Sequence, residues 1–572
     1  MNKSNTEAKT TVEWKELPGR KLERTTFKLQ KRIYQASGRG DHRTVKRLQK
    51  TLMKSKSAKC LAVRKVSQEN QGKKTAGVDG CKQLNPAQRL ALVKILKLSG
   101  KASPTRRVWI PKPGKKEMRP LGIPTIDDRG LQAIVKMALE PEWEALFEPN
   151  SFGFRPGRSC HDAIEAIYGA IKQKPKYVLD ADIAQCFDKI NHDALLKKLN
   201  TTPSIRRQIK SCLKANVMDG ETFFPTQEGT PQGNVVSPLL ANIALHGLEE
   251  HLMQYAETLD DKNIYRRQQS WKSKRMALSV IRYADDFVVL HKELRVIQEC
   301  QQLVSDWLKG MGLELKPEKT NVSHTLYKKD GKHGFSFLGF AIQQYEVGKH
   351  ASKQGFKTII TPDKEKLKSH IKEVGKLIHK HQGSSRDALI ATLNPIIRGW
   401  ANYYKTVCSK DIFQTADHQV YQQIRGWGIY RHEKMESVWH SKPGMSWTFA
   451  TKDGQHWQAL HSDTKITRHI KVKGNRSPYD GDWVYWSTRR VIYSQTPTQV
   501  AKLLKEQGGQ CSHCGNYFST ESLLEVDRID QNRNNNKPSN LRAVHRHCHD
   551  EIHAMRDSKA WDVNSNDYQP IP

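Results

Sequence analysis

Three hydrophobic patterns follow one another along the chain. In the first hundred residues, apolar side chains such as Phe27 and Ile33 recur at helical spacing among many lysines and arginines. Over residues 101–345, short apolar runs such as RRVWIP, KYVLDADI and VIRYADDFVVL alternate with helical stretches. Helical spacing returns over residues 362–430, where we expect three helices. This order predicts an α+β chain of several domains, because 572 residues exceed what one hydrophobic core usually holds.

Two further segments depart from these patterns. Residues 431–500 place five tryptophans among lysines and arginines, namely Trp439, Trp447, Trp457, Trp483 and Trp486. Aromatic rings between cations can stack on nucleobases, but the same rings could form the core of a small domain, and the sequence leaves both open. The last seventy residues are rich in Asp, Asn, His and Cys, the residue types that hold metals and move protons.

Charge narrows the classes of partner. The formal net charge of +36 implies a polyanionic partner, with nucleic acid as the first choice and a membrane surface as the second. No apolar run is long enough for a membrane-spanning helix, and the first residues hold no apolar secretion signal. Most of the ten cysteines are isolated, which suits a reducing compartment. The basic N-terminal helices are either a solvated face or a phosphate-binding arm.

Two segments bring carboxylates to the ends of predicted strands. VIRYADDFVVL predicts a β-hairpin with Asp285 and Asp286 at its tip, and much earlier in the chain Asp182 stands at the end of the apolar strand segment YVLDAD. Adjacent acids are often only a solvated turn, but carboxylates that repel each other are best tolerated beside a divalent cation. Phosphoryl transfer by two metal ions needs carboxylates from separate strands that converge on two Mg²⁺ ions. Asp182, Asp285 and Asp286 could supply that set.

The order of motifs around these acids resembles that of reverse transcriptases, and specifically of the proteins encoded by mobile group II introns. RVWIPKPGKKEMRPLGIPTIDDRGLQ and PNSFGFRPGRSCHDAI resemble the first two motif blocks, and the Asp182 strand resembles the third. GTPQGNVVSPLLANI, YADD, GLELKPEKT and FSFLGF resemble the fourth to the seventh. The resemblance implies a right-hand polymerase with fingers, a palm built on an antiparallel sheet, and a helical thumb. It also implies an RNA-directed DNA polymerase that uses an RNA template, a DNA primer and dNTPs.

The same resemblance assigns residues to the nucleotide site. Lys112 and Arg119 would grip the triphosphate of the dNTP, as paired cations do. Phe187 would lie under the sugar and exclude a 2′-hydroxyl, although it could also simply pack in the core. Gln232, in Pro-Gln-Gly, would line the nucleotide pocket and the template.

Three charged residues lie close to the acids in sequence. Lys319, in KPEKT, is a candidate for contact with the primer or with the acids themselves. Asp180 and Asp188 flank Asp182, but we expect them to make structural polar contacts rather than to bind metal.

NPIIRGWANYYKTV, residues 394–407, resembles the maturase region of the same family, called domain X. Ile397 and Trp400 belong to an apolar stripe that by itself indicates only a helix core, whereas Arg398 and Lys405 lie elsewhere and could meet phosphates. The resemblance implies that the protein binds its own intron RNA as a ribonucleoprotein and promotes splicing. Recognition of RNA by shape and backbone suits a broad basic surface.

Near the C-terminus, the spacing of cysteines predicts a metal site. Cys511 and Cys514 form a CxxC pair that needs two more ligands for a closed tetrahedral zinc site. His545 and Cys548, spaced as HxxC, are the best candidates. Zinc would stabilise a module too small to fold on its own hydrophobic core.

EVDRID, NL and HRHCH, around this site, resemble the HNH endonuclease domain found at the end of many intron proteins, which implies a small zinc-stapled ββα domain. In the resemblance, Asp527 and His549 would hold a divalent metal and Asn540 would orient the site. Arg528 stands where the family has its general-base histidine. Guanidinium stays protonated, so it cannot accept a proton from water. We therefore expect impaired cleavage, with binding of target DNA retained.

These matches divide the chain into six parts. The polymerase part comprises a basic N-terminal extension with the start of the fingers (1–100), the fingers and palm (101–345), and a thumb with domain X (346–430). It is followed by a Trp-rich DNA-binding or connector region (431–500), an HNH-like domain (501–560) and a tail (561–572). We expect a cytoplasmic, bacterial-type protein that copies its intron RNA into DNA at a target site during retrohoming. Two alternatives stay open. One is a stand-alone reverse transcriptase of a retron or defence system, and the other is an RNA-binding splicing cofactor without polymerase activity.

Overall fold

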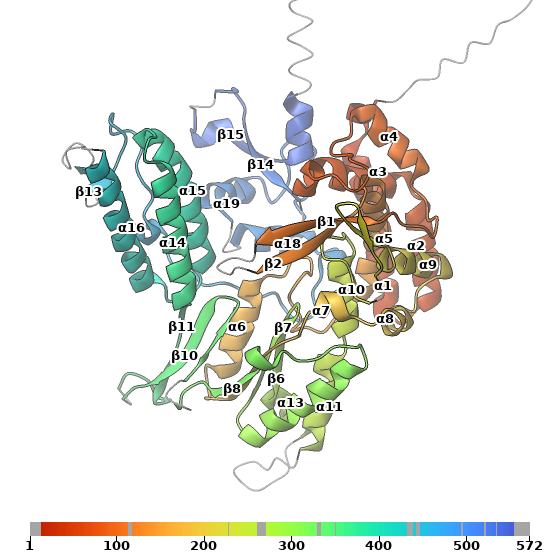
Figure 1. The fold of residues 1–572 in the computed structure, drawn as a ribbon, viewed down its shortest axis with the longest axis horizontal. Coiled ribbons are helices and arrows are strands. Elements are labelled where there is room, and N and C mark those ends of the chain that lie inside the picture. Colours follow the sequence, from red (N-terminus) through yellow and green to blue (C-terminus); the bar gives the residue numbers. More distant parts are fainter. Residues whose placement is uncertain are drawn as a thin grey trace, which may run out of the picture.

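The computed structural model describes residues 13–111, 117–226, 228–259, 270–328, 333–348, 350–431, 439–441, 447–492, 496–519, 522–532 and 535–553. Helices near the N-terminus and helices near the C-terminus of the described chain lie beside each other (Figure 1). Three long helices stand together on the opposite side of the molecule (Figure 1). No helix in the described ranges is long and apolar enough to cross a membrane.

An N-terminal helical layer packs around one long central helix. Its members are α1 (Gly19–Gly38), α2 (His42–Lys54), α3 (Lys56–Arg64), α4 (Pro86–Ile95) and the central α5 (Ile126–Glu144). Asp41 and Ser55 start α2 and α3 by accepting hydrogen bonds from backbone amides of the first turn. Apolar residues such as Ile33 and Ile134 form one buried core between these helices. The predicted helical N-terminus is thus confirmed for the described residues.

A first four-stranded sheet extends from this layer, with strand order β2-β1-β4-β5. Its strands are β1 (Thr105–Pro111), β2 (Met118–Ile123), β4 (Val217–Asp219) and β5 (Thr222–Phe224). β1 and β2 form an antiparallel hairpin in which Ile110 pairs with Arg119. Large apolar side chains of this sheet, such as Trp109 and Phe223, remain about half exposed.

The central sheet has the strand order β6-β7-β3-β8, and its strands pair antiparallel. Its strands are β3 (Tyr177–Asp182), β6 (Ser279–Tyr283), β7 (Asp286–His291) and β8 (Asn321–His324). Side chains alternate between its two faces. Phe287 and Val289 enter one core and Val288 and Leu290 enter another, so both faces are covered.

Helices cover both faces of the central sheet. α6 (Cys160–Ile171) packs on the face of Val288, because Ile164 and Ile167 share its core. The opposite core is shared by α8 (His192–Leu199), α9 (Pro203–Leu213), α10 (Ser237–Leu245), α11 (Leu248–Thr258) and α13 (Leu294–Lys309). Two short helices, α7 (Cys186–Lys189) and α12 (Trp271–Ala277), lie between these elements in the chain.

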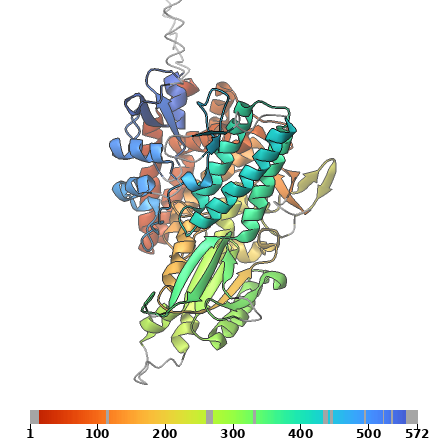
Figure 2. The same ribbon diagram turned by 90° about the vertical axis from the view of Figure 1, so that its left-hand side faces the viewer.

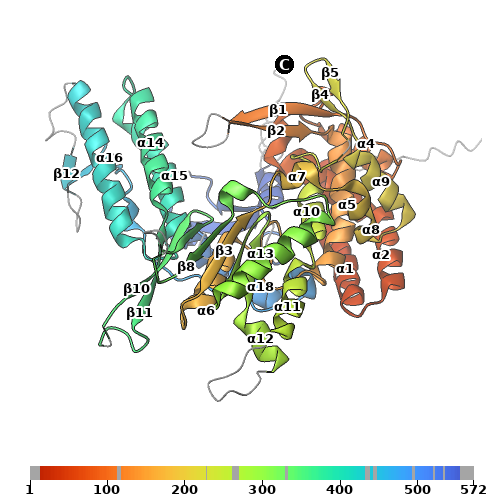
Figure 3. The same cartoon turned by 60° about the horizontal axis from the view of Figure 1, so that its bottom comes forward.

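A three-helix unit follows a small sheet, β11-β10-β9, in which the strands are β9 (Phe335–Phe337), β10 (Phe340–Glu346) and β11 (Phe356–Pro362). The unit consists of α14 (Lys364–Lys380), α15 (Arg386–Tyr404) and α16 (Lys410–Tyr430), as the sequence predicted. Figure 2 shows these helices side by side above the small sheet. In Figure 3 the central sheet lies between the three-helix unit on one side and the first sheet with the N-terminal layer on the other.

The chain then returns to the body of the molecule. Strands β12 (Trp439–Ser441) and β13 (Trp447–Phe449) pair, and a connector (residues 450–492) ends in α18 (Trp483–Ile492). A C-terminal module (residues 496–553) contains α19 (Thr498–Glu506), the antiparallel strands β14 (Leu524–Arg528) and β15 (Leu541–His545), and a helix over 546–553.

The connector belongs to the core of the central sheet. Trp486 is almost fully buried there, and a Cβ at Gly157 would overlap its ring. The connector is also tied to α6 by a buried carboxylate, because Asp162 accepts hydrogen bonds from Arg489 and from the backbone amide of Val472, both at 2.7 Å. Of the five tryptophans, the side chains of Trp439 and Trp447 lie outside the described residues.

Candidate active site and C-terminal metal centre

The three candidate carboxylates meet at one end of the central sheet. Asp182 is the last residue of β3 and Asp286 is the first of β7, and the two are direct partners across these neighbouring strands. Asp285 occupies the turn between β6 and β7, which form the predicted hairpin. Residues more than a hundred positions apart in sequence therefore present carboxylates from adjacent strand ends, as phosphoryl transfer by two metal ions requires.

A strained turn holds the paired acids. Ala284 adopts φ +58°, a left-handed conformation that is uncommon for residues other than glycine. The turn lies directly on a loop, since a Cβ at Gly153 would overlap the backbone nitrogen of Ala284. Glycine at 153 therefore lets this loop pack directly against the backbone of the turn and support it.

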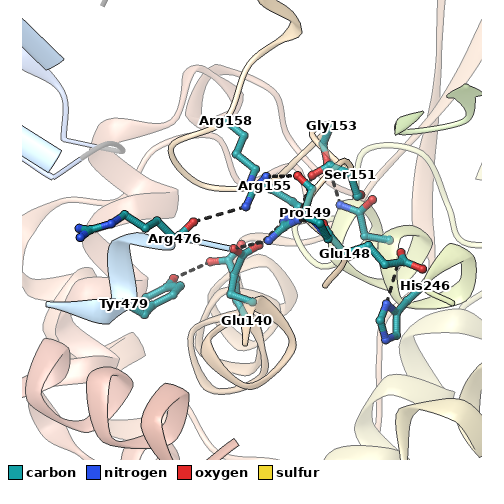
Figure 4. Close-up of polar contacts among 12 residues, drawn as sticks. Glu140, Glu148, Pro149, Ser151, Gly153, Arg155, Arg158, His246, Arg476 and Tyr479 are labelled. Atoms are coloured by element: carbon teal, nitrogen blue, oxygen red, sulfur yellow. Dashed lines mark hydrogen bonds and ion pairs between the residues drawn. The ribbon is translucent and has the colours of Figure 1, made fainter. Parts of the chain in front are cut away.

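Buried arginines fix that loop. Arg282, on β6, donates to the carbonyl oxygen of Ala284 at 3.1 Å and to the hydroxyl of Ser151 at 2.7 Å. Figure 4 shows Arg155 and Arg158 within the same network, where Arg155 donates to the carbonyl oxygen of Ser151 at 2.9 Å and Arg158 to that of Pro149 at 2.6 Å. Because these guanidinium groups are buried and hydrogen-bonded, the turn that carries Asp285 rests on a rigid support.

The carboxylates repel one another in a partly desolvated setting. Burial, followed by the charges of Asp285 and Asp182, raises the pKa of Asp286 to about 7. Burial likewise raises the pKa of Asp285, and burial with the charges of Asp286 and Asp182 raises that of Asp180 to about 7. Excess negative charge with oxygen donors is the chemistry that Mg²⁺ neutralises, so these residues fit divalent cations.

Lys319 contacts the acids directly. Its ammonium group forms an ion pair with Asp182. Burial works to lower the pKa of Lys319, but the hydrogen bond and charge of Asp182 outweigh it and raise that pKa. The predicted contact of Lys319 with the acids is therefore present.

The candidate nucleotide-binding residues approach from the first sheet and the adjoining loops. Arg119 is exposed on β2, close enough for its charge to oppose part of the rise that burial causes in the pKa of Asp285. The half-buried ring of Phe187 meets Phe154 edge to face, with 5.9 Å between centroids. The carbonyl oxygen of Gln232 accepts a hydrogen bond from the backbone amide of Gly122 at 2.7 Å. Lys112 lies outside the described residues.

Two residues of the three-helix unit, Arg398 and Lys405, were predicted to meet phosphates, and the structure places them differently. Arg398 is exposed on α15. Lys405 is buried instead, its ammonium group donates to Asn402 at 3.1 Å, and burial lowers its pKa. The prediction that Lys405 faces phosphates is therefore wrong, because the connector crosses this helix end, where Thr467 donates to the carbonyl oxygen of Lys405.

Three family models match successive parts of the chain. The N-terminal domain of reverse transcriptase matches residues 14–96, the reverse transcriptase (RNA-dependent DNA polymerase) matches residues 110–342, and the group II intron maturase-specific domain matches residues 367–443. Asp182, Asp285 and Asp286 all fall within the second match.

Curated relatives agree with these matches. The chain is 31% identical to Protein YkfC of Escherichia coli over 353 residues, which cover 55% of this chain and 87% of YkfC. It is 29% identical to the group II intron-encoded protein LtrA of Lactococcus lactis over 378 residues, which cover 53% of this chain and 60% of LtrA. The chain belongs to the group II intron reverse transcriptase and maturase family. Maturase-like protein 1 of Euglena gracilis is 32% identical over 40% of this chain and 50% of its own length.

Membership identifies the chain as an RNA-directed DNA polymerase and maturase. Its mixed helices and sheets are those expected for a reverse transcriptase of several domains. The reverse transcriptase match contains the central sheet with the three acids, and the maturase match contains α15 and α16.

Beyond the matched ranges, the C-terminal module of this reverse transcriptase brings together the four predicted zinc ligands. One ligand atom from each of Cys511, Cys514, His545 and Cys548 lies within 4.8 Å of all the others. Nδ1 of His545 faces the thiols, at 3.4 Å from Sγ of Cys514. Hydrogen bonds from Cys514 and Cys548 lower the pKa of the Cys511 thiol, which favours the thiolate that zinc binds. A Cys₃His set of which three members are buried and Cys514 is half-buried fits structural zinc.

A second cluster lies on the same module. Asp527 and His549, the predicted pair, are joined by His553, and the three lie within 4.8 Å of one another. Oδ1 of Asp527 is 3.9 Å from Nε2 of each histidine, and the two Nε2 atoms are 3.2 Å apart. Two histidines and one carboxylate fit a divalent transition metal.

Arg528 and Asn540 hold the loop beside this cluster. The Arg528 guanidinium donates to Oδ1 of Asn536 at 2.8 Å, and its side chain alternates with that of Asp527 along β14. Asn540 donates to Oδ1 of Asp530 at 2.7 Å and accepts from the backbone amide of Asp530 at 3.0 Å. These contacts close the connection between β14 and β15.

Sequence reasoning missed one member of this cluster, His553, and one partner of it, Arg542. His553 follows His549 at i+4 on the last helix, a spacing that places both rings on one face and could have identified it. Arg542 donates to Asp527 at 2.7 Å from the opposite strand. The strand register that makes this ion pair has no local sequence signal.

Proposed function

We propose that this reverse transcriptase binds its own intron RNA, assists its splicing and copies it into DNA at a target site. The observation that carries the proposal is the pairing of Asp182 with Asp286 across β3 and β7, with Asp285 in the adjoining turn. The polymerase and maturase activities follow from family membership. What we propose is the identity of the RNA, the protein's own intron, and the use of a DNA target site.

The residues of the active site divide the work between charge and shape. We assign two Mg²⁺ ions to Asp182, Asp285 and Asp286; such ions lower the pKa of a primer hydroxyl and neutralise the leaving pyrophosphate. Arg119, with Lys112, would hold the triphosphate, and Phe187 would exclude a 2′-hydroxyl. Lys319 would release Asp182 when metal binds, because one carboxylate oxygen cannot serve both cations fully.

A lysine stripe supports the binding of folded RNA. Lys364, Lys368, Lys372 and Lys376 recur at i+4 spacing along α14, and all four are exposed. Residues four apart lie on one face of a helix, so these ammonium groups form a ridge along the three-helix unit. A ridge of cations suits the phosphates of a folded RNA, which is read by shape and backbone.

Primer extension on an RNA template with Mg²⁺ tests the polymerase part. We expect cDNA from the purified protein, and co-purification of a single intron RNA when the protein is expressed with its flanking sequence. Failure to make cDNA would favour a splicing cofactor without polymerase activity. Activity without any bound intron would favour a stand-alone reverse transcriptase.

We propose a second activity for the C-terminal module. It would be an HNH-type domain stapled by zinc at Cys511, Cys514, His545 and Cys548, as their clustering supports. Asp527, His549 and His553 would hold a divalent metal, and Asn540 would brace the site. Cleavage of target DNA would be slow, because Arg528 cannot accept a proton and the described contacts commit its guanidinium to Asn536. Calorimetric titration with Mn²⁺ tests the metal site, since Asp527→Ala should abolish binding.

A further inference from the structure

A cavity of about 630 Å³ lies where three distant parts of the chain meet. Its walls are formed by one face of α1, by α3 and α5, and by the start of α18 together with the C-terminal module. The module contacts the N-terminal layer closely here, because Asn516 donates to Glu23 at 3.0 Å and His547 lies 3.5 Å from the same carboxylate. The volume falls in the range of about 300–1,000 Å³ that is typical of ligand sites.

The cavity has a large excess of positive charge. Eight lysines and arginines and only three glutamates line it. Each of the three acids already has a cationic partner, since Glu23 and Glu69 share Arg64 at 2.5 and 2.9 Å and Glu140 pairs with Lys136 at 3.2 Å.

Four cations on α1 remain without such partners. Arg20, Arg24, Lys28 and Lys31 recur every three or four residues, so they share one helical face, and each lines the cavity. Within the described part of the chain, none of them forms an ion pair. Cations gathered on a cavity wall without counter-charges indicate an anionic ligand.

Aromatic rings complete the wall. Phe27 and Trp483 are in contact, with 4.3 Å between ring centroids, and the rings of Trp483 and Tyr517 are nearly parallel, at 5° and 6.3 Å. All three rings line the cavity, and both Trp483 and Tyr517 are only half buried. Aromatic faces between cations are the surface on which unpaired bases stack.

We propose that this cavity binds a short segment of single-stranded DNA, with bases against Trp483 and Tyr517 and phosphates against the cations of α1. The cavity is too small for a duplex, so only an unpaired strand can enter it. His547 faces the cavity from the helix over 546–553, whereas His549 and His553 face the Asp527 cluster from the same helix. Cavity and cluster are thus about one helix diameter apart, about 10 Å.

We infer DNA rather than RNA as the ligand of the cavity, because a strand bound there would lead toward the Asp527 cluster. This choice rests on the proposed DNA-directed role of the cluster, but binding in the cavity needs neither cleavage nor polymerisation. The two proposals can therefore fail separately.

The test uses the full-length protein, a fluorescein-labelled oligothymidylate and a matched oligouridylate. The variant Arg24→Gln/Lys28→Gln removes two cavity cations. The control Lys21→Gln/Arg32→Gln removes two exposed cations of the same helix that do not line the cavity. We expect the first variant to bind oligothymidylate about tenfold more weakly, with a salt slope lower by about 1.4, since each phosphate contact of a single strand contributes about 0.7. The control should change the affinity less than twofold.

Equal weakening of oligothymidylate and oligouridylate would overturn the assignment to DNA, and unchanged affinity of the first variant would overturn the site itself. A second measurement is independent of stability. An oligonucleotide carrying 5-iododeoxyuridine should crosslink under ultraviolet light to Trp483 or Tyr517, as located by mass spectrometry. Crosslinks confined to residues outside the cavity would also overturn the proposal.

Discussion

The two candidate metal centres of this reverse transcriptase are built in opposite ways. Asp182 and Asp286 stand on adjacent strands of a sheet that is covered on both faces by large cores. The four candidate zinc ligands stand around a two-stranded sheet whose hydrophobic core is small. The first site is positioned by packing, so a metal bound there would be free to serve chemistry. In the second, we expect metal to help to form the fold that presents its ligands.

The two sites that would hold catalytic metal also differ in charge. At the candidate polymerase site, burial and the neighbouring carboxylates raise the pKa of Asp285 and of Asp286, and the charge of Lys319, joined at Asp285 by that of Arg119, offsets this only in part. At the Asp527 cluster, a single carboxylate is already paired with Arg542. Unbalanced negative charge binds cations strongly, so we expect the polymerase site to be active and the second cluster to bind metal weakly.

The largest expected effect concerns the zinc ligands. Cys548→Ser should cost most of the binding energy of the ion, on the order of 10 kcal/mol, and unfold the C-terminal module. Zinc content should fall to zero and limited proteolysis should remove the module, while primer extension stays within about twofold. Cys408→Ser, at an exposed cysteine, is the matched control. A module that resists protease without zinc would show that packing alone supports it.

The next effect concerns the polymerase acids. Asp285→Asn with Asp286→Asn should lower the rate of primer extension by at least about a thousand-fold, or about 4 kcal/mol, because the cations would lose their ligands. Affinity for intron RNA, measured by filter binding, should stay unchanged. Asp180→Asn is the control, since this half-buried acid, with its pKa raised to about 7, is only about half ionised at pH 7, and the substitution should lower the rate less than tenfold. Loss of RNA binding in the double variant would contradict the separation of the two functions.

A smaller effect concerns the buried hydrogen bonds by which Asp162, on α6, holds the connector. Asp162→Asn should destabilise the protein to urea by about 3 kcal/mol at pH 7, because it removes the carboxylate charge beside the buried guanidinium of Arg489. Glu165→Gln, on the same helix and only half buried, should cost far less.

Low pH should weaken the same interaction between Asp162 and the connector. Burial works to raise the pKa of Asp162, but His469 and Arg489 outweigh it and hold that pKa at about 2, below the ordinary 3.8. A depressed pKa contributes stability above pH 4, about 2 kcal/mol, which is lost as pH falls toward 2. Wild type and Asp162→Asn should therefore converge in urea stability between pH 4 and 2. A constant difference across this range would assign the effect to packing instead.

The smallest effect concerns the Asp527 cluster. Arg528→His should raise nicking of target DNA by between about ten- and a hundred-fold, because it supplies a group that can accept a proton. Arg528→Lys, which keeps the charge, should leave the rate unchanged. Efficient nicking by the unaltered protein with Mg²⁺ would show that another residue takes the proton, and would remove the contrast drawn between the two sites.

Several features followed from the sequence because they are encoded locally. The short apolar runs in YVLDAD and VIRYADDFVVL determine three strands, and the turn between the two runs of the second segment places Asp285 and Asp286 at a hairpin tip. The spacings CxxC and HxxC bring pairs of zinc ligands to the same turn. Helical periodicity over residues 362–430 determines α14, α15 and α16. Such patterns depend only on the geometry of strand, turn and helix.

Other features depended on which faces meet in three dimensions. Lys405 is buried only because the connector returns across α15, and Arg542 reaches Asp527 only through the register of β14 and β15. The tryptophans show this most clearly. The sequence allowed either a core or a stacking role for them. In the structure, Trp486 packs in the core of the central sheet, whereas Trp483 lines the cavity beside α1. Three residues apart on one helix, they face different neighbours, which only the packing of distant segments could decide.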